Sequence, residues 1–522
     1  MPRYLMASIL LCMAGAASAF SPGGAGIEQL RRALDSGAIS DVQLVRYYLG
    51  RIKRFDKTGP RINALISLNA NALRQARRID DQLKIKSLRP MLFGIPFIVK
   101  DNFDTAGIPT SAGSAALKHS IPPMNASAVQ KLLDQGAILI GKANMSELAS
   151  SYGRLGYSSA GGLTLNPYNT SRDVSGSSSG SAAALAADFA AFALGTDTSG
   201  SIRGPASVAG LVGLRPTYGL ISRGGVVPLS LSFDTVGILA RSVGDIAIVL
   251  DVLAGADPTD AATLERPRSL GRFADRIDQG SLPGVRLGVV GNFRGGNDEV
   301  DGAEQQVLKV LYDQGAVLIP VSLPASFEHL WDSVMAPVGR AELRPQLERY
   351  LRTLPAGQPK TLPELIDTSV LLRDRGSLSP INPALLKALR EAPAGENISP
   401  GYLQIVTQII PALRHELQAL MASENLGALV FSTMSCPASP RFDIPDLRYV
   451  CRSNDSYKAS YIAATVGFPE ISVPVGQISE NLPVGYSFLG TPDSEGALLG
   501  VANAVQQALR LARGSAPGPT LQ

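Results

Sequence analysis

One segment of the chain reads Asp173-Val-Ser-Gly-Ser-Ser-Ser-Gly-Ser-Ala-Ala-Ala184 and is followed, after a short apolar segment, by Gly195-Thr-Asp-Thr-Ser-Gly-Ser-Ile-Arg-Gly-Pro205. Two clusters of serine and glycine therefore lie on either side of the apolar residues 182–194. A stretch rich in serine and glycine is usually a flexible linker. Because the segment between these two clusters is apolar and must be buried, we expect two ordered loops beside one core.

Upstream, Lys100 closes the apolar run Gly94-Ile-Pro-Phe-Ile-Val-Lys-Asp101. A single lysine after a strand is usually a surface residue. A lysine buried at the end of such a run loses hydration, so its neutral form becomes accessible near neutral pH. A neutral lysine can act as the base that activates a serine. The lysine and the two serine clusters together predict a hydrolase that works through two serines and a lysine, without a histidine.

The same residues resemble the amidase signature family, whose motifs correspond to Ser175-Gly-Ser-Ser-Ser-Gly180, Gly195-Thr-Asp-Thr-Ser-Gly-Ser-Ile-Arg203 and Ile98-Val-Lys-Asp101. The likeness extends from about Ile27 to Ala512. It includes Leu139-Ile-Gly-Lys-Ala-Asn-Met-Ser-Glu147, Gly210-Leu-Val-Gly-Leu-Arg-Pro-Thr-Tyr-Gly-Leu220, Tyr461-Ile-Ala-Ala-Thr-Val-Gly-Phe-Pro469 and Pro483-Val-Gly485.

Within the family, the chain looks most like the secreted bacterial peptide amidases. This closer likeness is carried by Thr58-Gly-Pro-Arg-Ile-Asn63, Thr110-Ser-Ala-Gly-Ser-Ala115 and Pro483-Val-Gly-Tyr-Ser-Phe-Leu-Gly490. It implies an enzyme that converts a carboxamide, such as a C-terminal peptide amide, into a carboxylate and ammonia.

The resemblance implies a role for each residue of the serine clusters. Ser201 is expected to be the nucleophile that forms an acyl-enzyme, and Ser177 is expected to relay its proton to Lys100. In the family the peptide bond before the relay serine is cis, and Gly176 supplies backbone freedom there. Ser178 is a further supporting residue.

The resemblance also implies an oxyanion hole made of four backbone amides, those of Thr198, Ser199, Gly200 and Ser201. Ser199 stands where the family commonly has glycine, so it would add strain if that position needed a positive φ. Asp197 and Arg203 flank the nucleophile, and we expect them to fix the loop through charge-assisted hydrogen bonds.

A competing interpretation uses the same stretch, because Gly176-Ser-Ser-Ser-Gly180 also matches the nucleophile elbow of α/β-hydrolases, with Ser178 as nucleophile. That motif needs a strand just before it, whereas residues 166–173 are predicted to form a loop. The three histidines, His119, His329 and His415, lie outside any glycine-rich context. An esterase of this type is therefore the weaker alternative.

Three alternatives keep the amidase signature. A fatty or aryl amide hydrolase would use the same residues, and so would an A-type subunit of an aminoacyl-tRNA amidotransferase. Export argues against the amidotransferase, since charged tRNA is cytosolic. A catalytically silent binding protein is disfavoured because all three catalytic residue types are present.

Composition limits the partners of the chain. Its 522 residues are 45% hydrophobic and 18% charged, with a formal net charge of +4, which is typical of a globular protein. Lysine and arginine are scattered, so nucleic-acid binding is not supported.

No histidine pair or cysteine cluster suggests a metal site, and the chemistry needs no cofactor. The expected partner is a small-molecule or peptide amide. The sequence does not determine the oligomeric state, although a monomer is slightly favoured.

The N-terminus predicts export. A positive start, a short apolar stretch and Ala17-Ser-Ala19 are typical of a signal peptide over residues 1–19, cleaved after Ala19. The apolar run is short for a membrane span, so we expect no membrane anchor after cleavage and a location in the periplasm or outside the cell. The mature chain keeps Cys436 and Cys451, which could pair in an oxidising compartment or remain separate buried thiols.

Apolar strands and helical patterns alternate along the chain, which predicts an α/β fold with a central mixed, twisted sheet and helices on both faces. We expect one amidase-signature domain over residues 20–512, with a catalytic core at about 90–245. A more helical insertion at about 325–425 should border the substrate pocket. Residues 513–522 are expected to form a disordered tail.

Overall fold

The structure of the protein is a computed structural model that describes residues 20–82, 89–266, 271–376, 379–394, 399–513 and 518–521. The expected signal peptide, residues 1–19, lies outside these ranges, and so does part of the expected disordered tail. Both remain expectations. Within the described ranges, no helix combines the length and the apolar character needed to cross a membrane.

In the described part of the chain, eleven strands form one mixed sheet. Their spatial order is β1 (Leu65–Leu68), β3 (Ile138–Ala143), β2 (Pro96–Lys100), β6 (Phe192–Asp197), β8 (Thr235–Ala240), β7 (Val212–Arg215), β12 (Glu470–Ile478), β13 (Leu482–Leu489), β11 (Ala428–Ser432), β9 (Arg286–Val290) and β10 (Val317–Val321). Strand β2 pairs in parallel with β3 and β6, and β9 pairs in parallel with β10 and β11. The remaining neighbours are antiparallel. A separate hairpin joins β4 (Tyr157–Ser158) to β5 (Gly162–Leu163).

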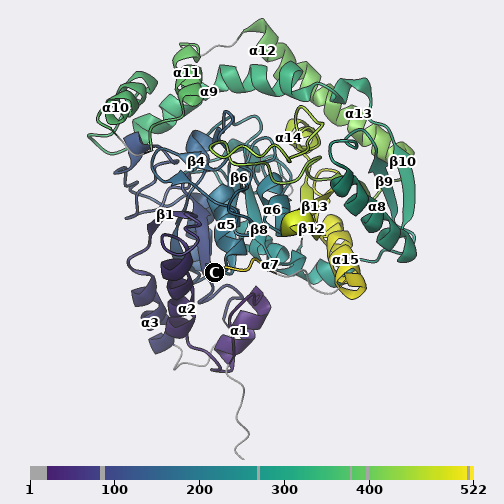
Figure 1. Ribbon diagram of the computed structural model, residues 1–522, viewed down its shortest axis with the longest axis horizontal. Coiled ribbons are helices and arrows are strands. Elements are labelled where there is room, and N and C mark those ends of the chain that lie inside the picture. The colour runs from purple at the N-terminus through teal and green to yellow at the C-terminus, as the bar shows by residue number, and fades with distance from the viewer. Residues whose placement is uncertain are drawn as a thin grey trace, which may run out of the picture.

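Helices surround this sheet (Figure 1). They are α1 (Ile27–Asp35), α2 (Asp41–Phe55), α3 (Ala72–Gln82), α4 (Ser127–Asp134), α5 (Ser179–Ala186), α6 (Arg203–Val208), α7 (Val243–Leu253), α8 (Asp298–Asp313), α9 (Ala336–Thr353), α10 (Leu362–Asp374), α11 (Pro383–Glu391), α12 (Pro400–Gln404), α13 (Ile410–Ser423), α14 (Ser460–Val466) and α15 (Glu495–Arg513).

The sheet is buried on both faces, as the sequence predicts. Along β2, Phe97 and Val99 pack into one apolar cluster that includes α7 and α15, whereas Ile98 packs into a second cluster that includes α5 and α6. Successive side chains of a strand point to opposite faces, so a strand covered on both sides is apolar throughout. This double burial is what carries Lys100 into the interior at the end of β2.

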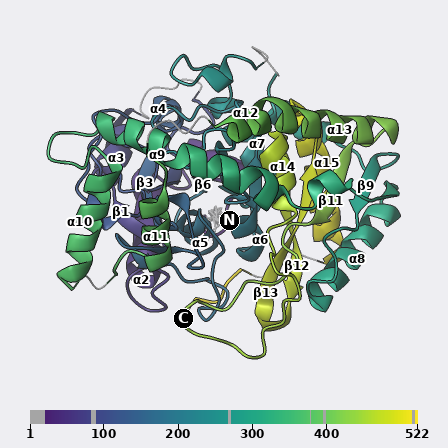
Figure 2. The same cartoon turned by 90° about the horizontal axis from the view of Figure 1, so that it is seen from above.

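The segment between β10 and β11 is mostly helical and arches over the loops at one end of the strands (Figure 1). Seen from above, α9, α12 and α13 run across the strands (Figure 2). Leu347 and Leu351 of α9 share an apolar cluster with Met145 and Leu148, which follow β3. The helical segment is therefore packed onto the loops that leave the strands.

A disulfide closes one long loop between β11 and α14. Cys436 and Cys451 are bonded, with their Cα atoms 5.6 Å apart. The pairing that the sequence left open is thus present. We call residues 436–451 the disulfide loop. Within it, the Ser439 carbonyl accepts a hydrogen bond from the Asp173 N–H at 2.8 Å, which anchors the loop beside the first serine cluster.

Candidate active site

Lys100 ends strand β2 inside the protein and is fully buried. Its Nζ lies 2.8 Å from Ser177 Oγ and 2.7 Å from Thr196 Oγ1, with the Thr196 carbonyl at 3.5 Å. A neutral amine has two N–H donors and one lone pair. It can therefore donate to both oxygens of Thr196 and accept a hydrogen bond from the Ser177 hydroxyl, which is the geometry of a base.

Burial lowers the pKa of Lys100 to about 7, because the charged ammonium loses its hydration. Asp234 and Asp197 act on this pKa in the opposite direction, raising it by charge attraction. Both carboxylates are held by other groups. Asp234 accepts a hydrogen bond from Thr198 Oγ1 at 2.5 Å, and Asp197 is paired with Arg203 at 2.9 Å. A substantial fraction of Lys100 is therefore neutral near pH 7.

Ser177 lies in a loop that is held from two sides. The peptide bond between Gly176 and Ser177 is cis, as the resemblance implies. The Ser177 carbonyl accepts a hydrogen bond from the Ser146 N–H at 3.1 Å. On the other side, the Tyr457 hydroxyl accepts from the Gly176 N–H at 3.1 Å and forms a short contact with Ser175 Oγ.

The fold brings the two serine clusters into contact. The Ser178 N–H donates to the Ser201 carbonyl at 3.2 Å. Ser201 therefore lies against the residue that follows Ser177, next to the Lys100 pair. It is 8% exposed, and its hydroxyl has no hydrogen-bond partner among the described residues. The hydroxyl is thus free to react.

The loop after β6 presents unpaired backbone amides. Asp197 accepts the Gly200 N–H at 2.9 Å. Within the described part of the chain, the N–H groups of Thr198, Ser199 and Ser201 have no acceptor. Three of the four amides expected to form the oxyanion hole are therefore free to bind a ligand, while the fourth is already engaged inside the loop.

The strain considered for Ser199 does not arise, because the left-handed backbone falls on the next residue. Gly200 has φ of 117°, and Ser199 does not have a positive φ. A Cβ atom at Gly200 would come within 2.4 Å of Ser460 Oγ. The same Ser460 hydroxyl donates to the Ser199 carbonyl at 2.7 Å. Glycine is thus required at position 200, and serine fits at 199.

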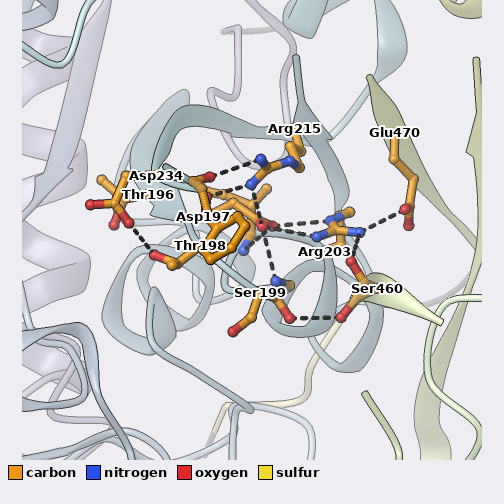
Figure 3. A network of polar contacts seen from close by, with 12 residues as sticks. Thr196, Asp197, Thr198, Ser199, Arg203, Arg215, Asp234, Ser460 and Glu470 are labelled. Carbon is orange, nitrogen blue, oxygen red and sulfur yellow. Dashed lines mark hydrogen bonds and ion pairs between the residues drawn. The ribbon is translucent and has the colours of Figure 1, made fainter. Parts of the chain in front are cut away.

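A buried network of charges fixes this loop (Figure 3). Asp197 pairs with Arg203 at 2.9 Å and with Arg215 at 3.0 Å, and Arg203 also pairs with Glu470 at 2.6 Å. All four side chains are fully buried. Burial alone would raise the pKa of Asp197, but the two arginines hold it well below its usual range. Asp197 therefore stays charged, and its pairs with the two arginines hold the loop in place. Burial raises the pKa of Glu470, the fourth member of the network.

The elbow interpretation fails on the geometry around Ser178. Its Oγ is buried and donates to the Thr196 carbonyl at 3.1 Å, so the hydroxyl faces the core. Residues 166–173 form a loop with a single isolated bridge instead of a strand. His119, His329 and His415 are all exposed on the surface. The described part of the chain therefore contains no strand–serine–helix elbow with a histidine partner at Ser178.

Several residues of the site were not identified from the sequence. Thr196 lies within the second serine motif. Its position beside Asp197 at the end of a strand was the feature from which a role in the site could have been inferred. Tyr457 and Ser460 had no signal, since their contacts with the serine loops span more than 250 residues of chain. Arg215 and Glu470 are charged residues within apolar strands, a pattern that indicates buried pairing.

The chain is similar to known proteins over most of its length. The Amidase family matches residues 43–499. The A-type subunit of the glutamyl-tRNA(Gln) amidotransferase of Thermoanaerobacter pseudethanolicus is 36% identical over 92% of this chain and 96% of its own length.

Solved structures are similar over nearly the whole chain. The peptide amidase from Stenotrophomonas maltophilia is 35% identical, with a TM-score of 0.83 over 96% of this chain and 99% of its own. An amidase family protein from Bacillus anthracis is 30% identical, with a TM-score of 0.82 over 96% and 93%. The chain belongs to the amidase signature family and is an amide hydrolase.

Proposed function

We propose that the enzyme converts carboxamides into carboxylates and ammonia through an acyl-enzyme on Ser201, with Ser177 and Lys100 as the proton relay. The observation that carries this proposal is the 2.8 Å contact between Lys100 Nζ and Ser177 Oγ, made by a buried lysine whose pKa is about 7. The contact between the two serine clusters supports placing the nucleophile beside this pair.

The first half of the reaction forms the ester. Ser201 Oγ attacks the amide carbonyl carbon while its proton moves to Ser177 Oγ, whose own proton moves to Lys100 Nζ. The carbonyl oxygen becomes an oxyanion, and the unpaired amides of Thr198, Ser199 and Ser201 stabilise it. As the C–N bond breaks, the proton held by Lys100 returns through Ser177 to the nitrogen, and ammonia leaves.

The second half hydrolyses the ester. Water attacks the acyl carbon, and its proton passes to Lys100 by the same relay. The ester bond to Ser201 then breaks, and the serine oxygen takes back a proton as the acid is released. The buried pair of Asp197 and Arg203 positions the oxyanion loop without touching the substrate.

We propose C-terminal amides of peptides as the substrates. The likeness to the Stenotrophomonas maltophilia peptide amidase supports this choice. A small leaving group needs little room, so internal peptide bonds should be spared. The helical segment around α9 packs on the loops after β3 and would shape the acyl side of the pocket.

The test compares kcat/KM for an amidated dipeptide, a long-chain fatty amide and an aryl amide, with ammonia as the readout. The proposal expects the dipeptide amide to be preferred. A preference for either of the other two would keep the amidase reaction and discard the peptide-amide substrate.

A second candidate function follows from the sequence relatives. The 36% identity to the A-type subunit of an amidotransferase favours glutamine as an ammonia donor. Release of ammonia from free glutamine, but not from amidated peptides, would favour this alternative.

We also propose that the enzyme is exported and cleaved after Ala19. The positive start and short apolar stretch of residues 1–19 support export, and the disulfide suits an oxidising compartment. N-terminal sequencing of the protein recovered from the periplasm or medium should begin at Phe20. Retention of the full chain in the cytosol would contradict export.

A further inference from the structure

Arg154 lies in the turn before β4, where two aromatic rings hold its guanidinium. Its Cζ lies 4.8 Å from the ring centre of Phe442 and 5.4 Å from that of Tyr157. The two rings contact each other edge to face, with centres 5.5 Å apart. A guanidinium stacked on aromatic faces still presents its N–H edge to other groups. The half-buried Arg154 is therefore a fixed cation with donors to spare.

No carboxylate in the part of the chain that the structure describes lies within ion-pair distance of Arg154. The acidic residues of the neighbouring disulfide loop are paired with other arginines. Asp443 pairs with Arg441 at 2.6 Å, and Asp446 pairs with Arg172 at 2.9 Å. The charge of Arg154 is thus available to a ligand.

The turn that carries this arginine is packed directly against the serine loop. Gly156 donates its N–H to Ser146 Oγ at 3.0 Å, and the Ser146 N–H donates to the Ser177 carbonyl at 3.1 Å. A Cβ atom at Gly176 would come within 3.1 Å of Leu155 Cδ2. The arginine is therefore next to residues that contact the relay serine.

Two other parts of the chain meet at the same place. Phe442 belongs to the disulfide loop, which is anchored to Asp173 just before the first serine cluster. The Tyr157 hydroxyl donates to the Pro380 carbonyl at 2.6 Å, in the segment between α10 and α11. The aromatic pair that holds Arg154 thus joins the disulfide loop to the helical segment proposed to shape the acyl pocket.

We propose that Arg154 is a specificity-determining residue that binds a carboxylate on the acyl part of the substrate, which favours amidated peptides with an acidic side chain. This inference rests on the proposed peptide-amide function. A guanidinium can donate two parallel N–H bonds to a carboxylate, and such charge-assisted pairs are stronger than neutral hydrogen bonds. A lysine at this position would keep the charge but lose the bidentate geometry.

The test measures kcat/KM for acetylated dipeptide amides in which one residue is leucine and the other is glutamate, methionine or lysine. The variable residue is placed first at one position of the dipeptide and then at the other. Wild-type enzyme should favour the glutamate peptide over the lysine peptide by about tenfold or more at one position, the size expected of a charge-assisted contact. Arg154→Met should lower kcat/KM for that glutamate peptide at least about fivefold more than for the methionine peptide. Arg154→Lys should retain part of the preference.

The matched control is Arg448→Met, because Arg448 belongs to the disulfide loop but is 86% exposed and paired with Asp446. It should leave the preference unchanged. Thermal unfolding of each variant shows whether it is folded. An equal loss on all peptides in both Arg154 variants would mean that the arginine only supports the fold, and this would overturn the inference. If the wild type turns over peptide amides without preferring glutamate, the inference about Arg154 is overturned and the proposed function is kept. If no peptide amide is turned over, both are overturned.

Discussion

The rate of the enzyme should follow the deprotonation of Lys100. Its pKa is about 7, and only the neutral amine can accept the proton from Ser177. The neutral fraction is about 1% at pH 5 and about 90% at pH 8 for a group with this pKa, so kcat/KM should rise by roughly 90-fold between these values. Below the pKa the slope should be close to tenfold per pH unit, and above it the rate should level off.

The assay is ammonia release from an uncharged amide substrate, so that the substrate does not titrate. Lys100→Arg gives the sharpest comparison because its guanidinium keeps the charge but does not lose a proton in this range. This variant should be inactive at every pH. Lys100→Met removes the base and should also be inactive.

Two buried carboxyl groups near the serine loop titrate in the same range and have to be separated from the lysine. Burial raises the pKa of both Asp173 and Glu147 to about 7. Asp173→Asn and Glu147→Gln should keep the acid limb if Lys100 produces it. A profile that is flat from pH 5 to pH 8 in a wild type limited by chemistry would refute the role of Lys100 as base.

Three further predictions concern support and stability. Tyr457→Phe removes the acceptor of the Gly176 N–H, and an unsatisfied buried amide costs about 1–3 kcal/mol. Because Tyr457 positions the loop of the relay serine, kcat should fall with little change in KM. A change confined to KM would contradict this role of Tyr457. Asp41 is buried without a hydrogen-bond partner for either carboxylate oxygen among the described residues, and burial raises its pKa to about 7. Because that value is above the unfolded one, its stabilising protonated form is lost as pH rises from about 4 through 7, at a cost of up to about 4 kcal/mol by pH 8. Asp41→Asn should therefore reduce the loss of melting temperature between pH 5 and pH 8, and an unchanged loss would contradict this. Finally, the Cys436–Cys451 bond joins residues 15 apart, so its reduction should lower the free energy of unfolding by about 3 kcal/mol in the chain-entropy model. Alkylation and mass spectrometry of freshly isolated exported protein would contradict the pairing if they found free thiols.

Local signals in the sequence were enough to predict the sheet and the centre of the site. The apolar run before Lys100 predicted a buried strand, and β2 is buried at every residue. The structure brings the two serine clusters into contact through Ser178 and Ser201, and Ser177 of the first cluster contacts Lys100.

The parts that could not be predicted depend on long-range packing. The contact of Tyr457 with Gly176 joins residues 281 apart, and no periodicity or motif encodes such a pair. The engagement of the Gly200 amide by Asp197 depends on the exact path of a loop. Within the apolar segment 182–194, strand β6 starts only at Phe192, because Asp188 has a positive φ and the chain turns before the strand begins.

Ser201 should carry the acyl group, and covalent trapping distinguishes it from the neighbouring serines. A serine-reactive phosphonate should be incubated with the wild-type enzyme and with the Ser201→Ala and Ser178→Ala variants, followed by peptide mapping in a mass spectrometer. We expect one adduct on Ser201 in the wild type and in Ser178→Ala, and none in Ser201→Ala, which should remain folded. An adduct on Ser178, or labelling and turnover that persist in Ser201→Ala, would show that Ser201 is not the nucleophile.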